Sequence, residues 1–158
     1  MGIVSIVGSD FDAFHALMNA YYREGEDADT PQEQVDEFIR FLGDKVESRE
    51  IEGCFLKEYD EYIGFALFAI DTDGFAFSEK PGYGTVLEIG IIPPYRSAGR
   101  GKVLVAFIED WFVANGVDKA YVSAYGPAHE FWEQCGYKDN GETASNDLPI
   151  MVKVLREL

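Results

Sequence analysis

Apolar residues recur along this chain in two rhythms, one typical of helices and one typical of strands. Apolar side chains three or four positions apart predict helices over 10–23, 30–47, 99–115 and 127–134. Short apolar and β-branched runs bounded by glycine or polar residues predict strands over 2–7, 51–59, 62–70, 85–92, 119–125, 137–141 and 148–155. The order βααβββαβαββ predicts an α+β fold, with one mixed central sheet and about four flanking helices.

Short polar signals separate the first five of these elements. Ser9 and Asp10 precede the first helix as capping residues. Thr30 is expected to cap the second helix, because Glu33 follows three positions later as in a capping box. Asp60-Glu61 lies between two β-rich runs and predicts a hairpin.

A chain of 158 residues most simply makes one domain, spanning 1–158. A chain of this size buries roughly 68–70% of its unfolded surface, so its core needs no disulfide or metal. Cys54 and Cys135 are too few for a disulfide framework. No basic segment with an apolar core follows Met1, and no apolar run is long enough to span a membrane. We therefore expect a cytoplasmic protein with reduced thiols.

The formal charge of −16 is the unusual feature of the composition. It argues against nucleic acid and anionic membranes as partners, because their phosphates would be repelled. It favours a cationic acceptor such as a polyamine, an aminoglycoside or a lysine amine. A high charge is also what solubility alone would favour, so both interpretations stay open.

The segment Arg96-x-x-Gly99-x-Gly101 lies between a strand-like run and a helix-like run. Its two glycines let a ligand approach the backbone, and the following helix directs its positive dipole end into the same space. This arrangement predicts a diphosphate-binding loop. It is not a Walker loop, because valine follows Lys102, and it lacks the third glycine of a dinucleotide fingerprint. The alternative is an ordinary tight turn between a strand and a helix.

The stretch Pro93-Pro94-Tyr95-Arg96-x-x-Gly99-x-Gly101 resembles the coenzyme A loop of the GNAT N-acetyltransferases, whose signature there is Arg/Gln-x-x-Gly-x-Gly/Ala. Three further segments agree in order: Leu87–Ile91 before the loop, Ala128–Tyr137 after the fifth strand, and Ile150–Lys153 at the end. The resemblance spans the chain and is specific mainly from Glu88 to Tyr137. It implies the GNAT fold, in which the central sheet is splayed open at the cofactor site.

The resemblance implies acetyl-CoA as the co-substrate. Its pantetheine would pair as an added strand with the backbone of Ile89, Gly90 and Ile91. Its pyrophosphate would be held by the backbone amides of Ser97, Ala98, Gly99, Arg100, Gly101 and Lys102. Extra positive charge at the rim would come from the side chains of Arg96, Arg100 and Lys102. Trp132, in the helix after the fifth strand, is expected beside the cofactor.

Acetyl transfer also needs a base and an acid. Glu88 is the candidate base, because it is the only acid in its apolar strand run and adjoins the segment that would face the thioester. A glutamate on the polar side of a half-buried strand is the alternative. Trp132 replaces the family's usual tyrosine, and an indole N–H donates a hydrogen bond but is no acid near neutral pH.

Tyr125 is expected to take over as the acid, unless it is a packed aromatic at a strand end. Tyr137 is a weaker candidate, and unaided departure of the thiolate is a further route. His129 and His15 are interpreted as ordinary helix residues. Cys135 has no histidine–acid partner pattern, and no paired cysteine or histidine spacing suggests zinc, so we expect no metal.

The first two helices and the segment 71–84 are expected to hold the acceptor, because the resemblance places them over the open side of the sheet. Aromatic and acidic residues there suit an amine by charge and by cation–π contact: Tyr21, Tyr22, Glu24, Glu26, Asp27 and Asp29. A solvated acidic loop explains the same residues equally well. No segment matches a particular class of acceptor.

The leading interpretation is an acetyl-CoA-dependent N-acetyltransferase that moves an acetyl group to a primary amine of a small molecule or peptide by direct attack on the thioester. A catalytically weak GNAT-like module that binds or senses acyl-CoA is the alternative, and Trp132 favours it. A third reading is an interaction domain whose glycine loop is only structural. The apolar run 148–155 permits a homodimer without requiring one.

Overall fold

The computed structural model describes residues 2–6, 10–25 and 27–157. In this part of the chain the α-helices are α1 (Phe11–Glu24), α2 (Gln32–Glu47), α3 (Arg100–Ala114) and α4 (His129–Gln134). The strands are β1 (Gly2–Ser5), β2 (Glu52–Glu58), β3 (Glu61–Ile70), β4 (Gly84–Ile91), β5 (Lys119–Ser123), β6 (Lys138–Thr143) and β7 (Pro149–Val154). Two short 3₁₀ turns are η2 (Pro93–Tyr95) and η3 (Gly126–Ala128). The predicted order of helices and strands is confirmed, with ends that shift by a few residues.

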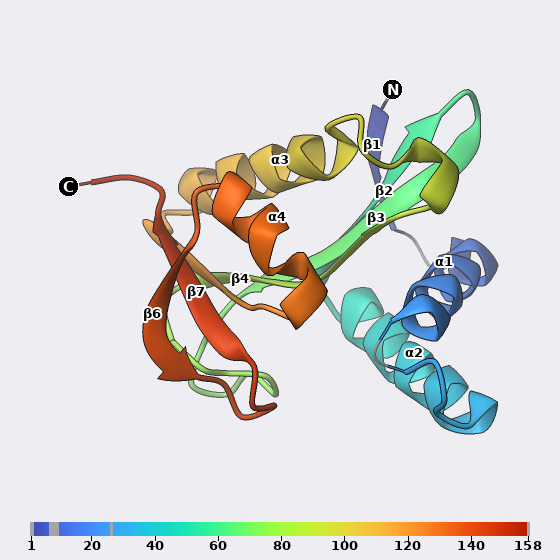
Figure 1. Cartoon of the computed structure of the whole chain (residues 1–158), viewed down its shortest axis with the longest axis horizontal. Coiled ribbons are helices and arrows are strands. Elements are labelled where there is room, and N and C mark those ends of the chain that lie inside the picture. The colour runs from blue at the N-terminus through green and yellow to red at the C-terminus, as the bar shows by residue number, and fades with distance from the viewer. Residues whose placement is uncertain (1, 7–9, 26, 158) are drawn as a thin grey trace. The chain divides into compact units, whose positions relative to one another are not determined.

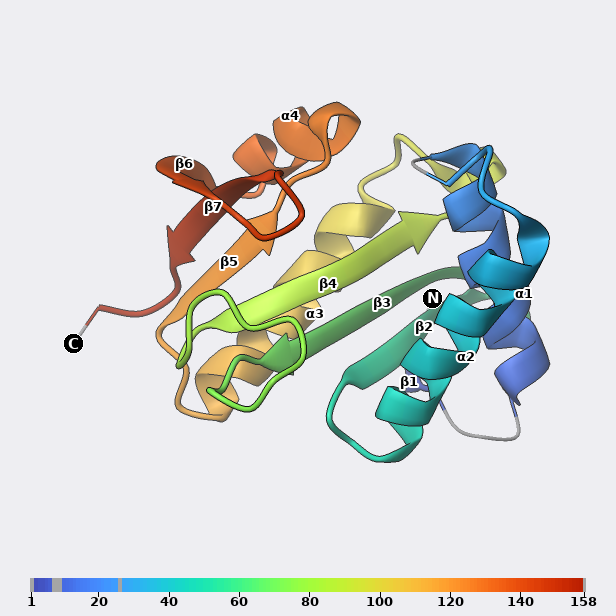
Figure 2. The same cartoon turned by 90° about the horizontal axis from the view of Figure 1, so that it is seen from below.

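The strands form one mixed sheet in the order β1-β2-β3-β4-β5-β7-β6. β4 and β5 are parallel, which the α3 crossover between them allows. The pairs β1–β2, β5–β7 and β6–β7 are antiparallel. Figure 2 shows β7 between β5 and β6, so the last strand of the chain is inserted beside the fifth. The predicted α+β class and mixed sheet are confirmed.

The chain divides into two compact units. The first combines Met1–Leu67 with Glu88–Gly101, and the second combines Phe68–Leu87 with Lys102–Leu158. The boundary between the units falls within β3, β4 and α3, so each of these elements has residues in both units. The organisation as one domain over 1–158 remains a prediction.

In the first unit, α1 and α2 lie side by side (Figure 1). α1 buries Phe14, Met18 and Tyr22, which recur every four residues along one face. Gly43 of α2 lies against the ring of Phe11, where a Cβ would come within 2.8 Å of Cε2. The strands of this unit add the buried side chains of Phe55, Leu56, Ile63, Phe65 and Leu67. The close packing of α1 against α2 therefore fixes the position of the residues at the end of α1.

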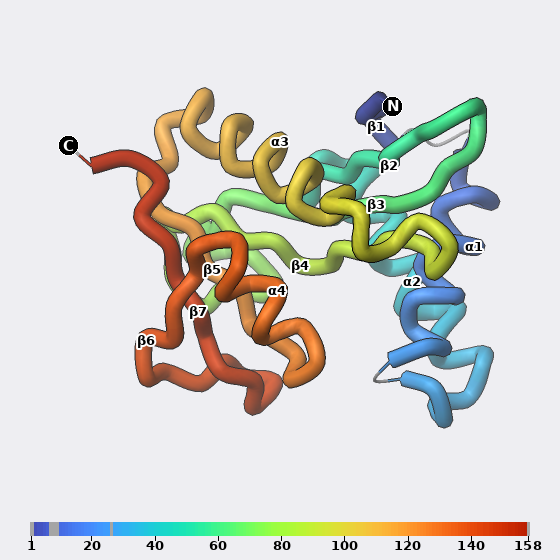
Figure 3. The backbone as a smooth tube through the Cα atoms, turned by 45° about the horizontal axis from the view of Figure 1, so that its top comes forward, coloured from blue at the N-terminus to red at the C-terminus, as the bar shows by residue number. Residues whose placement is uncertain are grey.

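In the second unit, α3 buries one face against the strands, with Leu104, Ile108 and Phe112 fully buried. The ring of Phe112 lies over Gly84, where a Cβ would come within 2.6 Å of it. β7 pairs with β5 on one side and β6 on the other, as the tube in Figure 3 shows. This packing fixes the start of β4 beside β5.

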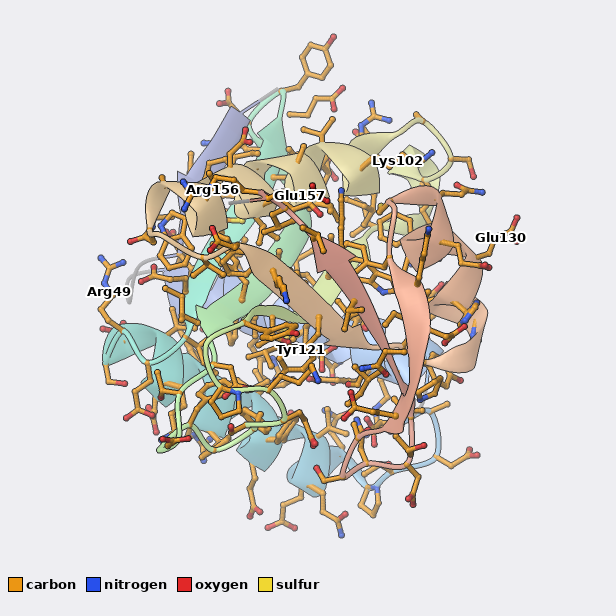
Figure 4. The ribbon with its side chains drawn as sticks, turned by 90° about the vertical axis from the view of Figure 1, so that its left-hand side faces the viewer. Arg49, Lys102, Tyr121, Glu130, Arg156 and Glu157 are labelled. Carbon is orange, nitrogen blue, oxygen red and sulfur yellow. The ribbon has the colours of Figure 1, made fainter. Side chains whose placement is uncertain are left out.

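The segment 71–83 of the second unit is organised by a buried acid, Asp71. Its Oδ2 accepts the backbone N–H groups of Glu79 and Lys80, each at 2.8 Å. The hydroxyl of Tyr121 on β5, labelled in Figure 4, donates to the same oxygen at 2.6 Å. Burial raises the pKa of Asp71, but the hydrogen-bond donors outweigh it and hold the pKa below its usual range. The carboxylate therefore ties the segment to the sheet.

The predicted helix caps are not made by the expected side chains. Asp10 precedes α1 without a side-chain cap hydrogen bond, and Ser9 lies outside the described residues. The cap position of α2 is Pro31, so the prediction for Thr30 was wrong. The hydroxyl of Thr30 donates to a carboxylate oxygen of Asp27 at 2.9 Å instead. Thr30 lies one residue before the cap position, because α2 begins at Gln32.

The hairpin between β2 and β3 is confirmed, but it turns one residue earlier than predicted. Its two central residues are Tyr59 and Asp60, with φ of 51° and 63°. Two left-handed residues in a row are the geometry of a type I′ turn, which suits the twist of a two-residue hairpin. Side-chain type alone did not reveal that a tyrosine would take such a position.

Candidate active site

The segment between β4 and α3 carries the predicted diphosphate loop. Ser97 and Gly99 have left-handed backbone, with φ of 64° and 80°. Glycine adopts this conformation readily, and nothing lies within 4 Å of the place where a Cβ of Gly99 would be. In the described part of the chain, no backbone hydrogen bond outside helices and strands uses the N–H of Ser97, Ala98 or Gly99. Since α3 begins at Arg100 with N–H groups that lack helical partners, the loop presents consecutive donors suited to an anion.

Arg96 is exposed but is tied to two other parts of the first unit. Its guanidinium forms a two-point ion pair with Glu24 at the end of α1, with 2.5 Å between Nη2 and Oε1. Its Nε donates to the carbonyl of Ile91 at 2.7 Å, which closes the loop on itself. The hydrogen bonds from Arg96 hold the pKa of Glu24 below its usual range. The signature arginine therefore links the loop to α1.

Arg100 and Tyr95 are held by two further glutamates of the same unit. Arg100 forms a two-point ion pair with Glu58 at the end of β2, at 2.9 and 3.0 Å. The hydroxyl of Tyr95 donates to Glu61 at the start of β3, at 3.0 Å. The guanidinium of Arg100 also lies 5.1 Å from the centre of the Tyr95 ring. Carboxylates from three different elements thus fix the side chains of the loop.

These pairs set the charge of the loop. The positive charges of Arg96 and Arg100 are each balanced by a carboxylate, whereas Lys102 is exposed on the first turn of α3 (Figure 4). The expected charge contribution of the two arginines to the cofactor stays a prediction. In the structure, the ion pairs of Arg96 and Arg100 link the loop to α1 and β2.

The pairing between β4 and β5 is short. In the described part of the chain the two strands pair at two positions, Gly84 with Ala120 and Thr85 with Tyr121. Val86 and Leu87 continue β4 beyond the last of these pairs. Such an unpaired strand edge can accept an extended ligand as an added strand. Ile89, Gly90 and Ile91 occupy the last half of β4 and are partly buried.

Glu88 is partly buried and accepts a hydrogen bond from α1. The hydroxyl of Tyr22 donates to its Oε1 at 2.9 Å. Tyr22 itself is only 6% exposed. Burial, followed by the charge of Glu88, raises the pKa of Tyr22, so its hydroxyl keeps its proton. The candidate base is therefore held by a buried donor that the sequence did not pair with it.

Gly90 lies on the same face of β4 as Glu88, two residues on. A Cβ at Gly90 would come within 2.8 Å of the Phe65 ring and 2.9 Å of the Tyr21 ring. These two rings meet edge to face at 5.5 Å. The absence of a side chain at Gly90 thus lets α1 approach the strand closely.

An open hollow lies in the first unit between α1, the end of β4 and the loop. Its walls are mostly apolar, and the Glu24–Arg96 ion pair closes one side. The lining consists of Leu17, Ala20, Tyr21, Glu24, Phe65, Gly90, Ile91, Ile92, Pro93 and Arg96. Two of the residues expected to line the acceptor site, Tyr21 and Glu24, are therefore at a real concavity, while Glu26 lies outside the described residues.

The second unit holds the other two predicted site residues. Tyr125 follows β5 and is 38% exposed, so the residue is accessible to a bound molecule. Trp132 on α4 is 4% exposed and packs edge to face on Phe131 and Tyr137, each at 5.1 Å. An accessible tyrosine can exchange a proton with a bound molecule, whereas a buried indole can contribute mainly by packing.

The remaining polar candidates are engaged in structural contacts. Tyr137 is buried and donates its hydroxyl to Glu109 at 2.9 Å, and burial raises its pKa. His129 contacts Asp139 at 2.8 Å between Nε2 and Oδ2. Burial also raises the pKa of the Cys135 thiol, which disfavours a reactive thiolate.

Residues 2–6, 10–25 and 27–157 contain neither a cluster of metal-binding side chains nor a helix that could span a membrane. No group of three or more histidine, cysteine or acidic side chains there is arranged to hold a metal ion. Within the same residues, no helix has both the length and the apolar character needed to cross a membrane. The absence of a metal in the working protein stays a prediction.

The sequence of the chain matches a known protein family. The model of the acetyltransferase (GNAT) family matches residues 11–137. No curated protein matches the sequence. The chain therefore belongs to the GNAT family of acetyltransferases, because the family model covers well over half of its length.

Solved structures with the same fold are distant in sequence. PaiA N-acetyltransferase from Thermoplasma acidophilum, in complex with coenzyme A, is 16% identical, with a TM-score of 0.74 over 98% of this chain and 99% of that one. A GNAT acetyltransferase from Staphylococcus aureus Mu50 is 11% identical, with a TM-score of 0.76 over 98% and 99%. An aminoglycoside 6′-N-acetyltransferase complexed with coenzyme A is 16% identical, with a TM-score of 0.71 over 100% and 99%. The predicted GNAT fold is confirmed.

Proposed function

We propose that this protein is an acetyl-CoA-dependent N-acetyltransferase that acetylates a primary amine of a small molecule or a peptide. The observation that carries the proposal is the loop Arg96–Gly101, with left-handed Ser97 and Gly99, in which the N–H groups of residues 97–99 have no backbone partner among the described residues. Membership of the GNAT family supports it, as do structural neighbours solved with coenzyme A.

The residues present fit a coenzyme A diphosphate. The N–H groups from Ser97 to Lys102 are the proposed donors, because these residues are exposed or partly exposed and lie at or just before the start of α3. Arg96 and Arg100 keep the loop in this shape, and Lys102 adds a positive charge. The backbone of Ile89, Gly90 and Ile91 is proposed to pair with the pantetheine, and Trp132 to pack near it. When bound, acetyl-CoA supplies the activated acetyl group as a thioester.

Glu88 and Tyr125 are the proposed proton-transfer residues. Glu88 accepts a proton from the attacking amine, directly or through water, since only a neutral amine is nucleophilic. Tyr125 donates a proton or a hydrogen bond to the departing sulfur, a role for which its exposure of 38% leaves it accessible. N–H groups of β4 beyond its pairing with β5 are suited to stabilise charge on the carbonyl oxygen.

A cationic amine is the proposed acceptor class. The formal charge of −16 attracts cations, and a mostly apolar hollow with two aromatic rings, Tyr21 and Phe65, lies beside β4. One structural neighbour acts, by its name, on aminoglycosides. Polyamines and aminoglycosides are therefore the first compounds to try, with amino acids and lysine peptides after them.

The test has two arms, binding and turnover. Acetyl-CoA should raise the melting temperature of the full chain, and Gly101→Glu should abolish that rise, because it places a negative charge in the loop. No rise at millimolar acetyl-CoA would exclude the proposal. Release of free CoA is then measured with each amine, and at least one compound should give turnover.

A matched pair of variants tests the acid. Tyr125→Phe removes only a hydroxyl and should lower kcat more than Trp132→Phe does. The opposite order would remove Tyr125 from the mechanism. Comparable melting temperatures for the two variants would exclude misfolding as the cause.

A second candidate function is a weakly catalytic module that binds or senses acyl-CoA. The burial of Trp132 at the position of the family's tyrosine favours it. Acetyl-CoA binding without CoA release across the whole amine panel is the result that would select it.

A further inference from the structure

The hydroxyl of Tyr22 donates a hydrogen bond to Glu88, the proposed base. We propose that Tyr22 is a positioning residue that orients the carboxylate of Glu88 and keeps it ionised for proton transfer. This inference rests on the proposed function, because it takes Glu88 as the base. It assigns a role in catalysis to a helix residue that does not belong to the cofactor loop.

The position of the Tyr22 hydroxyl is fixed by packing. The ring is 6% exposed and lies on the buried face of α1 with Phe14 and Met18. It packs against the rings of Tyr21 and Phe38, with centroids 5.4 and 5.7 Å away. A side chain locked in this way places its hydroxyl at one point, so the 2.9 Å bond to Oε1 of Glu88 restricts how that carboxylate can turn.

The bond also favours the charged form of Glu88. A hydrogen bond donated to a carboxylate stabilises the ionised state, and only that state can accept a proton. Among the described residues, the titratable groups that act on Tyr22 are Glu88, Tyr21 and Asp27, and all three disfavour loss of its proton. Tyr22 therefore stays a donor over the pH range in which Glu88 changes charge.

A purely structural contact between α1 and β4 is the competing explanation. It would make Tyr22→Phe less stable without changing how Glu88 titrates or how much the enzyme depends on it. Phenylalanine keeps the ring and its packing, so the variant is expected to fold and to isolate the hydroxyl.

The first measurement needs no acceptor. The side-chain carboxyl carbon of Glu88 is followed by NMR as the pH is lowered, in protein labelled with ¹³C-glutamate and assigned by loss of the signal in Glu88→Gln. In Tyr22→Phe the midpoint should move to higher pH. Tyr62→Phe is the matched control, because its hydroxyl lies 3.5 Å from Asp10 in the same unit, and it should leave the midpoint unchanged. An unchanged midpoint in Tyr22→Phe overturns the proposal.

The second measurement uses acetyl-CoA and the amine that gives the fastest CoA release in the panel. Tyr22→Phe should lower kcat about tenfold with an unchanged KM for acetyl-CoA, and should move the acid limb of the pH profile upward. In the Glu88→Gln background the same change should cost less than about twofold, because the two residues act as one. Equal losses in both backgrounds would overturn the proposal. Full activity of Glu88→Gln would remove its premise, whereas absence of acetyl-CoA binding by the wild type would refute the proposed function itself.

Discussion

Each unit contains one long loop, and the two loops are held in place by different groups. In the first, the loop after β4 leaves the N–H groups of residues 97–99 without a backbone partner among the described residues, and side-chain bonds to Glu24, Glu58 and Glu61 hold the loop and the start of α3. In the second, the segment 71–83 gives two N–H groups to the buried Asp71. If the loop binds a diphosphate through these N–H groups, as we propose, it cannot also use them to fix its own conformation, so side chains must do so.

The two devices also differ in strength. The Arg96–Glu24 pair is exposed, with 41% and 46% of its side chains accessible, and exposed ion pairs contribute little and weaken with salt. Asp71 is fully buried, and removing a buried acceptor leaves its donors unsatisfied. The contacts of the proposed diphosphate loop are therefore expected to contribute less to stability than those of Asp71 in the second unit.

The largest effect is expected at Asp71. Asp71→Ala leaves the hydroxyl of Tyr121 and two backbone N–H groups without their acceptor, so the free energy of unfolding should fall by about 2–4 kcal/mol. Urea denaturation followed by circular dichroism measures it. Asp73→Ala, an exposed acid in the same segment, is the control and should change stability by less than about 0.5 kcal/mol. A similar small change for Asp71→Ala would contradict the account of this segment.

The next effect is expected at Gly99. A Cβ there meets no atom within 4 Å, so Gly99→Ala costs only the left-handed backbone, about 1–2 kcal/mol. Acetyl-CoA affinity, measured by calorimetry, should fall about tenfold if the loop relaxes out of this conformation. Gly74→Ala has equally open surroundings and no left-handed φ, and it should affect neither quantity. Equal behaviour of the two variants would show that the loop conformation is unimportant.

A smaller effect is expected for the ion pair between loop and helix. Glu24→Gln and Arg96→Gln should each lower stability by about 0.2–1 kcal/mol and weaken acetyl-CoA binding about threefold, because both release the loop. The double variant should lose no more than either alone. Glu33→Gln makes the same change of charge on α2 and serves as the control. If Arg96→Gln weakens binding far more than Glu24→Gln, then Arg96 contacts the cofactor directly.

The smallest effect is a pH dependence at His129 in the second unit. The hydrogen bond to Asp139 is the main cause that raises the pKa of His129 in the folded protein. A raised folded pKa means that the pair stabilises fully below the unfolded value of about 6.5, and that this is lost as pH rises through the folded pKa. The melting temperature of His129→Gln should therefore fall further below wild type at pH 5.5 than at pH 8.5. An equal difference in melting temperature at the two pH values would show that the His129–Asp139 pair does not contribute to stability.

Some of these features could be predicted from the sequence, and the rest depend on distant partners. The element order and the loop follow from local patterns, since glycine spacing and apolar periodicity act within one or two turns. The pairs Tyr22–Glu88 and Arg96–Glu24 join residues 66 and 72 positions apart, which no local pattern encodes. The spacing of Phe14, Met18 and Tyr22 did carry a signal that Tyr22 is buried.

Asp71 and Thr30 show two other limits. Asp71 looked like the first residue of a polar loop, although an acid placed directly after an apolar strand is well placed to bind loop N–H groups. Thr30 matched a capping pattern, but the helix begins at Gln32, so Thr30 lies one residue before the cap position and its hydroxyl donates to Asp27.

The most direct test of the central claim is NMR of the backbone amides of ¹⁵N-labelled protein titrated with coenzyme A. The N–H groups from Ser97 to Lys102 are proposed to bind the diphosphate, so their signals should move most and downfield, and Gly101→Glu should abolish the change. Strong binding that leaves these amides unmoved, with the largest shifts elsewhere in the chain, would contradict the assignment of the loop.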